Sequence, residues 1–244
     1  GHVFYTTRKG YVSGAADLAD TVKGCFLGQA GDWCTTPAQS INYASCHDNM
    51  TLLDRITRST PGVSEEDRIR MNNLSAAIYM TAQGIPFLQA GEEMLRTKID
   101  ASGGFLENSY NSPDSVNSIK WDTLEDETYQ NVYNYYKGLI AFRKAHAALR
   151  LTNADDVNAN ITSVDGLDEN VLAFRINGGV NGETSDGIFV IFNPNSTETS
   201  VTLPDGAWDV CVNADHAGTE ALTTVSGSVS VEPISAMVLV KKES

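Results

Sequence analysis

The sequence predicts a mixed α/β segment followed by an all-β domain, and two observations indicate where one gives way to the other. Residues 1–150 contain 14 Lys and Arg against 17 Asp and Glu, whereas residues 151–244 contain 3 against 14. Before this division, apolar residues recur at helical spacing. After it, they form short β-branched runs separated by Gly, Asn, Asp and Pro. We therefore predict a domain boundary near residues 149–153.

The first segment predicts two short strands and two long helices. Residues 40–45 and 85–90 are uncharged runs with the composition of buried strands. Between them, residues 64–83 have a serine N-cap, three acidic residues in the first turn and apolar residues at helical spacing. A second helix is predicted over residues 125–149. This strand–helix–strand–helix order is typical of parallel strands with right-handed crossovers. Two such units cannot cover both faces of a parallel sheet, so they belong to a larger α/β body or to half a fold.

The sequence of the acidic C-terminal domain predicts a small antiparallel β-sandwich. Its apolar runs are rich in Val, Ile and aromatic residues, and Asn-Pro-Asn and Pro-Asp-Gly turn signals separate them. Such closely spaced short strands favour a sandwich over a parallel sheet. The six predicted strands are residues 171–176, 187–192, 199–203, 208–212, 228–231 and 236–240.

Composition excludes some classes of partner. The chain has 244 residues and a formal net charge of −14, which disfavours nucleic acid and anionic membrane surfaces. No run approaches the roughly 18 apolar residues that a membrane-spanning helix needs. The opening segment, residues 1–9, lacks the features of a signal peptide and has the character of a cut end, so localisation stays open.

The sequence predicts no metal site and no cofactor. Cys25, Cys34, Cys46 and Cys211 have neither zinc-like spacing nor a disulfide framework, and we expect single buried thiols. The acidic run at residues 165–169 offers the oxygen ligands that calcium takes. Runs of like charge are more often solvated surface, so calcium is not predicted there.

A cluster of polar residues directly follows the first predicted strand: His47, Asp48 and Asn49. In α/β sheets, ligands bind at the carboxyl ends of the strands, which makes this cluster a candidate site. An aspartate that caps the next turn beside a surface histidine explains the same pattern equally well.

Two more polar segments lie after the second predicted strand. Glu92 and Glu93 are adjacent carboxylates. Either both face inward, one with a raised pKa, or one faces inward and the other is solvated, which is the commoner outcome. Residues 108–117, within the irregular stretch 96–121, combine amides, hydroxyls, an aromatic ring and a carboxylate without lysine. These groups suit sugar hydroxyls, although Asn and Asp also populate self-contained turns.

Taken together, residues 41–49, 84–98 and 108–114 resemble the α-amylase superfamily of glycoside hydrolases. The His-Asp-Asn segment is shared across that superfamily. The Gly-Glu-Glu-Met-Leu-Arg-Thr-Lys and Asn-Ser-Tyr-Asn segments are most similar to type I pullulanases, which debranch α-1,6 linkages in pullulan, starch and glycogen. The resemblance implies that residues 1–150 are the C-terminal part of a catalytic (β/α)8 TIM barrel, containing strands seven and eight with their helices. Residues 151–244 are then the C-terminal antiparallel β-sandwich.

The resemblance also implies roles for four residues. Asp48 matches the third catalytic carboxylate, which binds the hydroxyls of the scissile sugar and stabilises its cationic transition state. His47 hydrogen-bonds the same ring, and Asp114 and Asn117 lie where the family grips the next sugar. The nucleophile and the general acid/base of this retaining mechanism belong to strands four and five. We therefore expect this chain alone to be inactive, with an α-glucan and the N-terminal part of the barrel as its partners.

Three alternatives stay open. The chain could be a non-catalytic carbohydrate-binding or scaffold module in which the sandwich is the functional part. Trp208 is the candidate for its sugar-stacking platform, whereas Phe174, Phe189 and Phe192 lie in apolar runs typical of a core. It could also belong to an inactive relative, or to one that acts on α-1,4 linkages.

Overall fold

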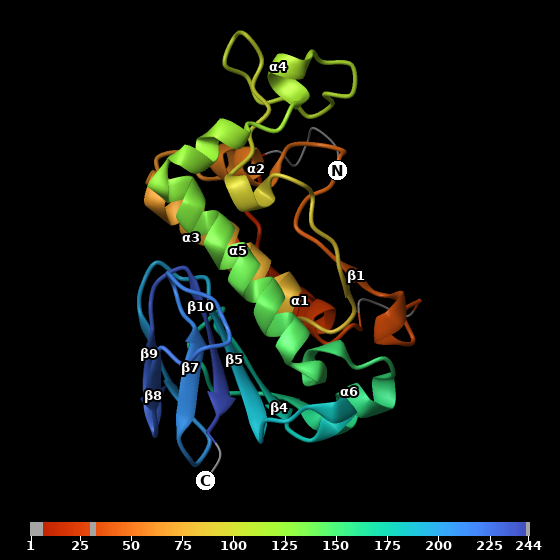
Figure 1. The fold of residues 1–244 in the computed structure, drawn as a ribbon, viewed down its shortest axis with the longest axis vertical. Helices are drawn as coiled ribbons and strands as arrows, with labels where there is room; N and C mark the ends of the chain where they lie inside the picture. Colours follow the sequence, from red (N-terminus) through yellow and green to blue (C-terminus); the bar gives the residue numbers. More distant parts are fainter. Residues whose placement is uncertain (1–6, 30–32, 243–244) are drawn as a thin grey trace.

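The computed structural model describes residues 7–29 and 33–242, so positions 1–6 of the opening segment lie outside the described residues. Figure 1 shows an elongated molecule with two long helices at its centre. The antiparallel strands lie at one end, and a set of loops around a short helix lies at the other. The chain is thus a mixed α/β structure with antiparallel β-sheets.

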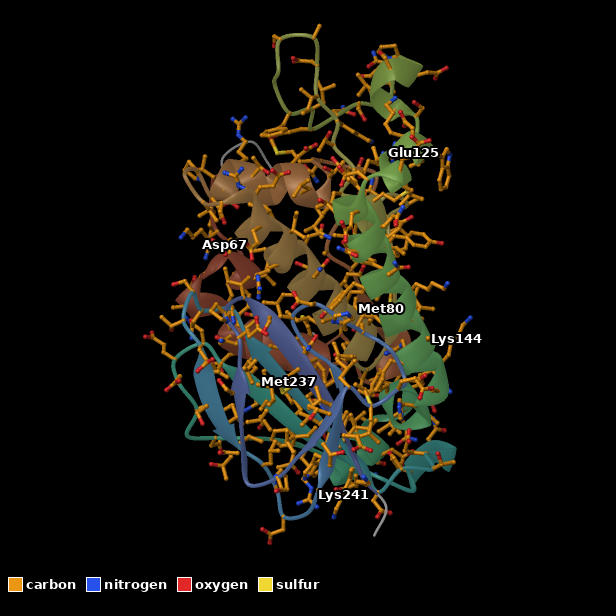
Figure 2. All side chains as sticks on the ribbon, turned by 60° about the vertical axis from the view of Figure 1, so that its left-hand side comes forward. Asp67, Met80, Glu125, Lys144, Met237 and Lys241 are labelled. Atoms are coloured by element: carbon orange, nitrogen blue, oxygen red, sulfur yellow. The ribbon has the colours of Figure 1, made fainter. Side chains whose placement is uncertain are left out.

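Two long helices, α3 (Glu65–Thr81) and α5 (Glu127–Ala145), organise the first 150 residues. The Ser64 hydroxyl accepts the Asp67 N–H at 3.1 Å, as the predicted N-cap requires. Figure 2 shows both helices running in the same direction, from Asp67 and Glu125 toward Met80 and Lys144. At that end the buried Arg143 donates from α5 to the carbonyls of Met80 and Ala82, at 2.9 and 2.7 Å. This guanidinium therefore satisfies carbonyl groups left open where α3 ends.

The predicted helix over residues 125–149 is shorter than expected. Helix α5 ends at Ala145, and a 3-10 helix covers Ala147–Arg150. His146 lies between them in an extended conformation, with its Nδ1 atom 3.1 Å from the Glu183 carboxylate. A tertiary contact, which periodicity does not encode, breaks the helix at this point.

The periodicity analysis missed four short helices. Each has eight residues or fewer, which is too short to show a repeating apolar stripe. One of them directly follows the His-Asp-Asn cluster. They are α1 (Ala19–Phe26), α2 (Leu52–Ser59), α4 (Asp114–Asn117) and α6 (Ala154–Asn160).

The two strands predicted in the first segment are present and parallel, but each is short. Strand β1 (Ile41–Asn42) pairs with β2 (Ile85–Pro86), and within the described residues neither has another partner. The residues that follow each strand form loops. Gly84, which enters β2 with φ +99°, could not carry a side chain, since a Cβ atom would lie 2.8 Å from the Ser40 carbonyl oxygen.

All six strands predicted after residue 150 are present, and the structure adds two at the edges of the main sheet, β3 and β8. The main sheet has the order β3-β4-β5-β10-β7-β8, and β6 and β9 form a second, two-stranded sheet. All the pairs in both sheets are antiparallel. The strands are β3 (Ile161–Ser163), β4 (Leu172–Asn177), β5 (Gly187–Asn193), β6 (Thr199–Thr202), β7 (Trp208–Val212), β8 (Thr223–Val225), β9 (Ser228–Val231) and β10 (Ser235–Lys241).

The main sheet is buried on both faces. One face packs on β6 and β9 around Trp208 and Phe189. The other packs on the helices, where Phe174 of β4 stacks on Phe26 of α1 with ring centroids 3.9 Å apart. Every residue of β5 is therefore buried, which explains its unbroken apolar sequence. The helices and the sheet share one core, and the boundary near residue 150 stays a prediction.

The described residues include no helix long and apolar enough to cross a membrane. Cys34 and Cys211 are buried, as expected of structural thiols, whereas Cys25 and Cys46 are only half-buried. All four cysteines are free.

Candidate functional site

The His-Asp-Asn cluster lies on the loop between β1 and α2. The His47 Nε2 atom is 3.5 Å from the Asp48 carboxylate, and the two side chains are 88% and 73% exposed. Asn49 has φ +65°, a left-handed conformation that asparagine tolerates better than most residues. Asp48 is not the N-cap of α2, since the Thr51 hydroxyl accepts the Asp54 N–H. The capping alternative for this aspartate is therefore wrong, and its carboxylate is open to a ligand.

The loop carrying these residues is attached at both ends to the segment that follows β2. At its start, the Ser45 hydroxyl lies 2.5 Å from Glu92 Oε1. At its end, Asp54 Oδ2 accepts the Lys98 N–H at 2.8 Å. We call residues 45–54 the site loop. Both attachments are buried, so water does not compete for them.

Glu92 and Glu93 have different environments, which confirms that one faces inward. Glu92 is 4% exposed, and its Oε2 atom accepts from the Tyr79 hydroxyl at 3.0 Å. Burial raises the pKa of the Glu92 carboxyl, although hydrogen bonds from Ser45 and Tyr79 oppose this. The half-buried Glu93 instead accepts the Gly91 N–H at 2.8 Å.

A chain of polar groups continues from Glu92 into the helical core. Tyr136 is among the neighbours that raise the pKa of Tyr79, and Asn72 Nδ2 donates to the Tyr136 hydroxyl at 3.0 Å. These side chains come from α3 and α5 and are all buried. The sequence analysis overlooked them, as it did Ser45 and Asp54. The signal that the sequence offered was Asn72, a polar residue among the apolar residues of α3.

The other two predicted site residues, Asp114 and Asn117, lie on α4. Asp114 is exposed at the first position of this helix. Asn117 Nδ2 donates to the carbonyls of Ser109 and Ser112, at 2.6 and 3.1 Å, so its amide nitrogen holds the loop together. Arg96 attaches this loop to the segment after β2 by donating to the Asn117 carbonyl. No hydrogen bond within the described residues joins α4 directly to His47 or Asp48.

The two short strands expose an apolar face. Ile41 and Tyr43 follow one strand at alternating positions, and Ile85 and Phe87 follow the other; their exposed fractions lie between 42% and 57%. The Tyr43 and Phe87 rings pack edge to face with centroids 5.9 Å apart. In Figure 1, α3 and α5 lie between β1 and the strands β7 and β10. One face of the parallel pair is therefore turned away from the core of this chain.

Unlike the segments that contain β1 and β2, the C-terminal sheets bury their aromatic side chains. Trp208, the candidate stacking platform, is 1% exposed and donates its indole N–H to the Pro204 carbonyl. Phe174, Phe189 and Phe192 are buried as expected. Among the described residues after 150, the exposed large apolar side chain is Leu222.

The described residues contain no group of three or more His, Cys, Asp or Glu side chains placed to hold a metal ion. In the acidic run at residues 165–169, the Asp168 carboxylate accepts the Thr199 hydroxyl at 2.5 Å. That carboxylate therefore joins its loop to strand β6 by a hydrogen bond.

Part of the C-terminal region matches a known family model. Residues 157–216, from the middle of α6 to the loop after β7, match the family model described as "Pullulanase, all-beta domain". The match agrees with the two antiparallel sheets described above.

The whole chain is similar to pullulanases. It is 35% identical to the pullulanase of Bacillus subtilis over 182 residues, which is 72% of this chain and 24% of that protein. It is 28% identical to the isoamylase of a Flavobacterium over 217 residues, which is 71% of this chain and 27% of that protein. The structure superimposes on the pullulanase of Bacillus acidopullulyticus with a TM-score of 0.92 and 38% identity, covering 99% of this chain and 29% of that one. The chain thus spans between 24% and 29% of the length of these three proteins.

Proposed function

We propose that this chain is the C-terminal portion of a retaining glycoside hydrolase that debranches α-1,6-glucosidic linkages in pullulan, starch or glycogen. The observation that carries this proposal is the superposition of 99% of the chain on a pullulanase at 38% identity. The similarity therefore includes both the site loop and the β-sheets. Structures similar to this one include pullulanases complexed with maltotetraose and with maltose, which supports an α-glucan as the ligand.

The parallel pair β1 and β2 supports assigning residues 1–150 to the end of a (β/α)8 barrel. In such a barrel, alternate residues of each strand face the interior. The exposed side chains of Ile41, Tyr43, Ile85 and Phe87 have this spacing and leave an apolar face open. The remaining N-terminal part of the barrel is the partner that we propose to cover them. Residues 151–244 are then the C-terminal β-sandwich.

The position of Asp48 suits a carboxylate that stabilises a transition state. It follows β1 at the carboxyl end of the parallel pair, and its side chain is 73% exposed. A carboxylate there accepts hydrogen bonds from sugar hydroxyls and stabilises the positive charge that develops on the sugar ring. His47 lies beside it, and we assign to it a hydrogen bond to the same ring.

Asp114 and Asn117 are proposed to bind a neighbouring sugar. Asp114 has an exposed carboxylate at the first position of α4. The amide nitrogen of Asn117 is bonded within the loop, so its side-chain oxygen is the group left for a sugar hydroxyl. Arg96 holds this loop on the segment after β2.

The bond-breaking pair must come from outside this chain. A retaining mechanism needs one carboxylate that attacks the anomeric carbon and a second that protonates the leaving oxygen. Glu92 cannot supply either, because it is 4% exposed and both of its oxygens are bonded to Ser45 and Tyr79. We therefore expect the 244-residue chain by itself to leave pullulan uncleaved.

The test is the substitution Asp48→Asn in the intact protein that carries this chain. Removing the charge while keeping the size should lower kcat on pullulan by about 10²- to 10³-fold, the usual loss for one transition-state stabilising group. Asp205→Asn, an exposed aspartate in a turn of the sandwich, is the matched control and should retain activity. Undiminished activity of the Asp48→Asn protein, or cleavage of pullulan by the 244-residue chain alone, would contradict the proposal.

The alternative of a carbohydrate-binding module has little support. Such modules stack sugars on exposed aromatic rings. In the described part of the sandwich, Trp208 and the three candidate phenylalanines are buried instead. Within the described residues, the exposed aromatic side chains lie before residue 150, at Trp33, Tyr43, Phe87, Tyr110, Trp121 and Tyr133.

A further inference from the structure

The site loop has little internal support for the residues at its tip. Met50 is buried, but His47, Asp48 and Asn49 are exposed. The polar contacts described within residues 46–49 are the 3.5 Å approach of His47 to Asp48 and a 3.9 Å contact from the Cys46 thiol to the Asp48 carbonyl. Neither is strong enough to fix a loop in water. The position of Asp48 therefore depends on how the ends of the loop are held, and Ser45 is only three residues away.

Ser45 has more acceptors around it than it has hydrogens. Its hydroxyl lies 2.8 Å from Gln89 Oε1 and 2.5 Å from Glu92 Oε1. A serine has one O–H hydrogen, so it cannot donate to both. Two arrangements resolve the conflict. Either the Gln89 amide turns so that its nitrogen donates to Ser45, or Glu92 Oε1 carries a proton and donates to Ser45 while Ser45 donates to Gln89.

The other oxygen of Glu92 fits the same arrangement. Tyr79 donates its hydroxyl hydrogen to Glu92 Oε2 at 3.0 Å, which a neutral carboxyl accepts as readily as a charged one. The titratable groups that face Glu92 are Tyr79 of α3, Tyr136 of α5 and the adjacent Glu93. None of them is a cation, so no positive charge there favours the ionised form. Burial acts in the same direction, since it raises the pKa of this carboxyl.

We propose that Glu92, in its protonated form, is a positioning residue for the debranching reaction: through Ser45 it fixes the start of the site loop and so holds His47 and Asp48 at the strand end. This inference rests on the proposed function. Glu92 itself touches no substrate. It transmits the rigidity of the α3–α5 core to a loop in which residues 47–49 are exposed.

The experiment compares four variants of the intact protein that carries this chain. Glu92→Leu and Ser45→Ala each remove the contact and should lower kcat on pullulan by about 10- to 100-fold, with a smaller effect on KM, because misplacing a catalytic group by about 1 Å costs this much. Glu92→Gln should restore near wild-type kcat, since its amide donates to Ser45 and its carbonyl accepts from Tyr79 as the protonated glutamate does. Glu93→Leu, the same change one residue away, is the control.

Two further measurements separate a positioning role from a general loss of structure. In the Ser45→Ala background, Glu92→Leu should cost little additional kcat, because the contact through which it acts is already absent. Hydrogen exchange of the amides of residues 46–50 should be faster in Glu92→Leu than in Glu93→Leu, and unchanged in Glu92→Gln.

The outcomes test the positioning role of Glu92 separately from the proposed function. If Glu92→Gln loses as much kcat as Glu92→Leu, or if the losses from Ser45 and Glu92 add fully, the positioning role of protonated Glu92 is wrong. If exchange in the site loop is the same in all four variants, it is also wrong. If the wild-type protein cleaves no pullulan while Glu92→Leu still accelerates exchange, the proposed function fails and the attachment of the loop stands.

Discussion

Gly138 tests how the helices dock on the β-sheet. It lies within α5, and a Cβ atom there would be 1.8 Å from the backbone oxygen of Ala217, in the loop between β7 and β8. In an isolated helix, Gly→Ala stabilises by about 1 kcal/mol. Here the helix and the loop would have to separate by about 1.5 Å to reach an ordinary contact distance. Because the obstacle is backbone, it cannot rotate away.

We therefore expect Gly138→Ala to destabilise the chain by about 2 kcal/mol, since overpacking typically costs about 1–3 kcal/mol and here exceeds the gain in helix propensity. Thermal unfolding of the 244-residue chain should show a melting temperature lower by about 4–8 °C. The control is Gly218→Ala in the same loop, where an added Cβ meets nothing within 4 Å. A Gly138→Ala protein as stable as wild type, or more stable, would refute the docking of α5 on this loop.

Two further substitutions test the shared core and its electrostatics. Phe174→Ala removes a fully buried ring that stacks on Phe26, and it should cost about 3–5 kcal/mol in urea unfolding; a loss below about 1 kcal/mol would contradict the stacking. The pKa of the Glu183 carboxyl is lowered, because hydrogen bonds from His146, Ser185 and the Ala148 N–H outweigh the opposing effect of burial. The charged Glu183 therefore stabilises the folded chain at pH values above its unfolded pKa, near 4.5. This stabilisation is lost as the pH falls through the folded pKa. Glu183→Gln should be less stable than wild type at pH 7, and the difference should shrink on acidification below about pH 4.5; a gap that does not depend on pH would show that the charge is irrelevant.

Local chemistry predicted much of the secondary structure. The capping serine and the acidic first turn located the start of α3 to the residue. The β-branched runs located all six strands predicted in the C-terminal sheets, because strand formation there depends on apolar residues between clear turn signals. The edge strands β3 and β8 were missed, since three residues carry too little pattern to recognise.

The candidate site was predicted only in part. The sequence singled out His47 and Asp48, because a polar cluster after an apolar run is visible without a structure. In the structure, β1 ends at Asn42 and the cluster lies on the loop that follows it. It could not show that Asn117 uses its amide nitrogen within its own loop, since that depends on where Ser109 and Ser112 lie.

The sequence by itself determined the two long helices and the six strands predicted after residue 150, because capping, periodicity and turn formation act over a few neighbouring residues. Only the tertiary structure decided that Glu92 is buried and that it meets Ser45, 47 positions away in the chain. It likewise decided that Trp208 is buried rather than available to stack on a sugar. Burial and hydrogen bonding between distant segments depend on how the elements pack, and a single sequence does not specify the geometry of that packing position by position.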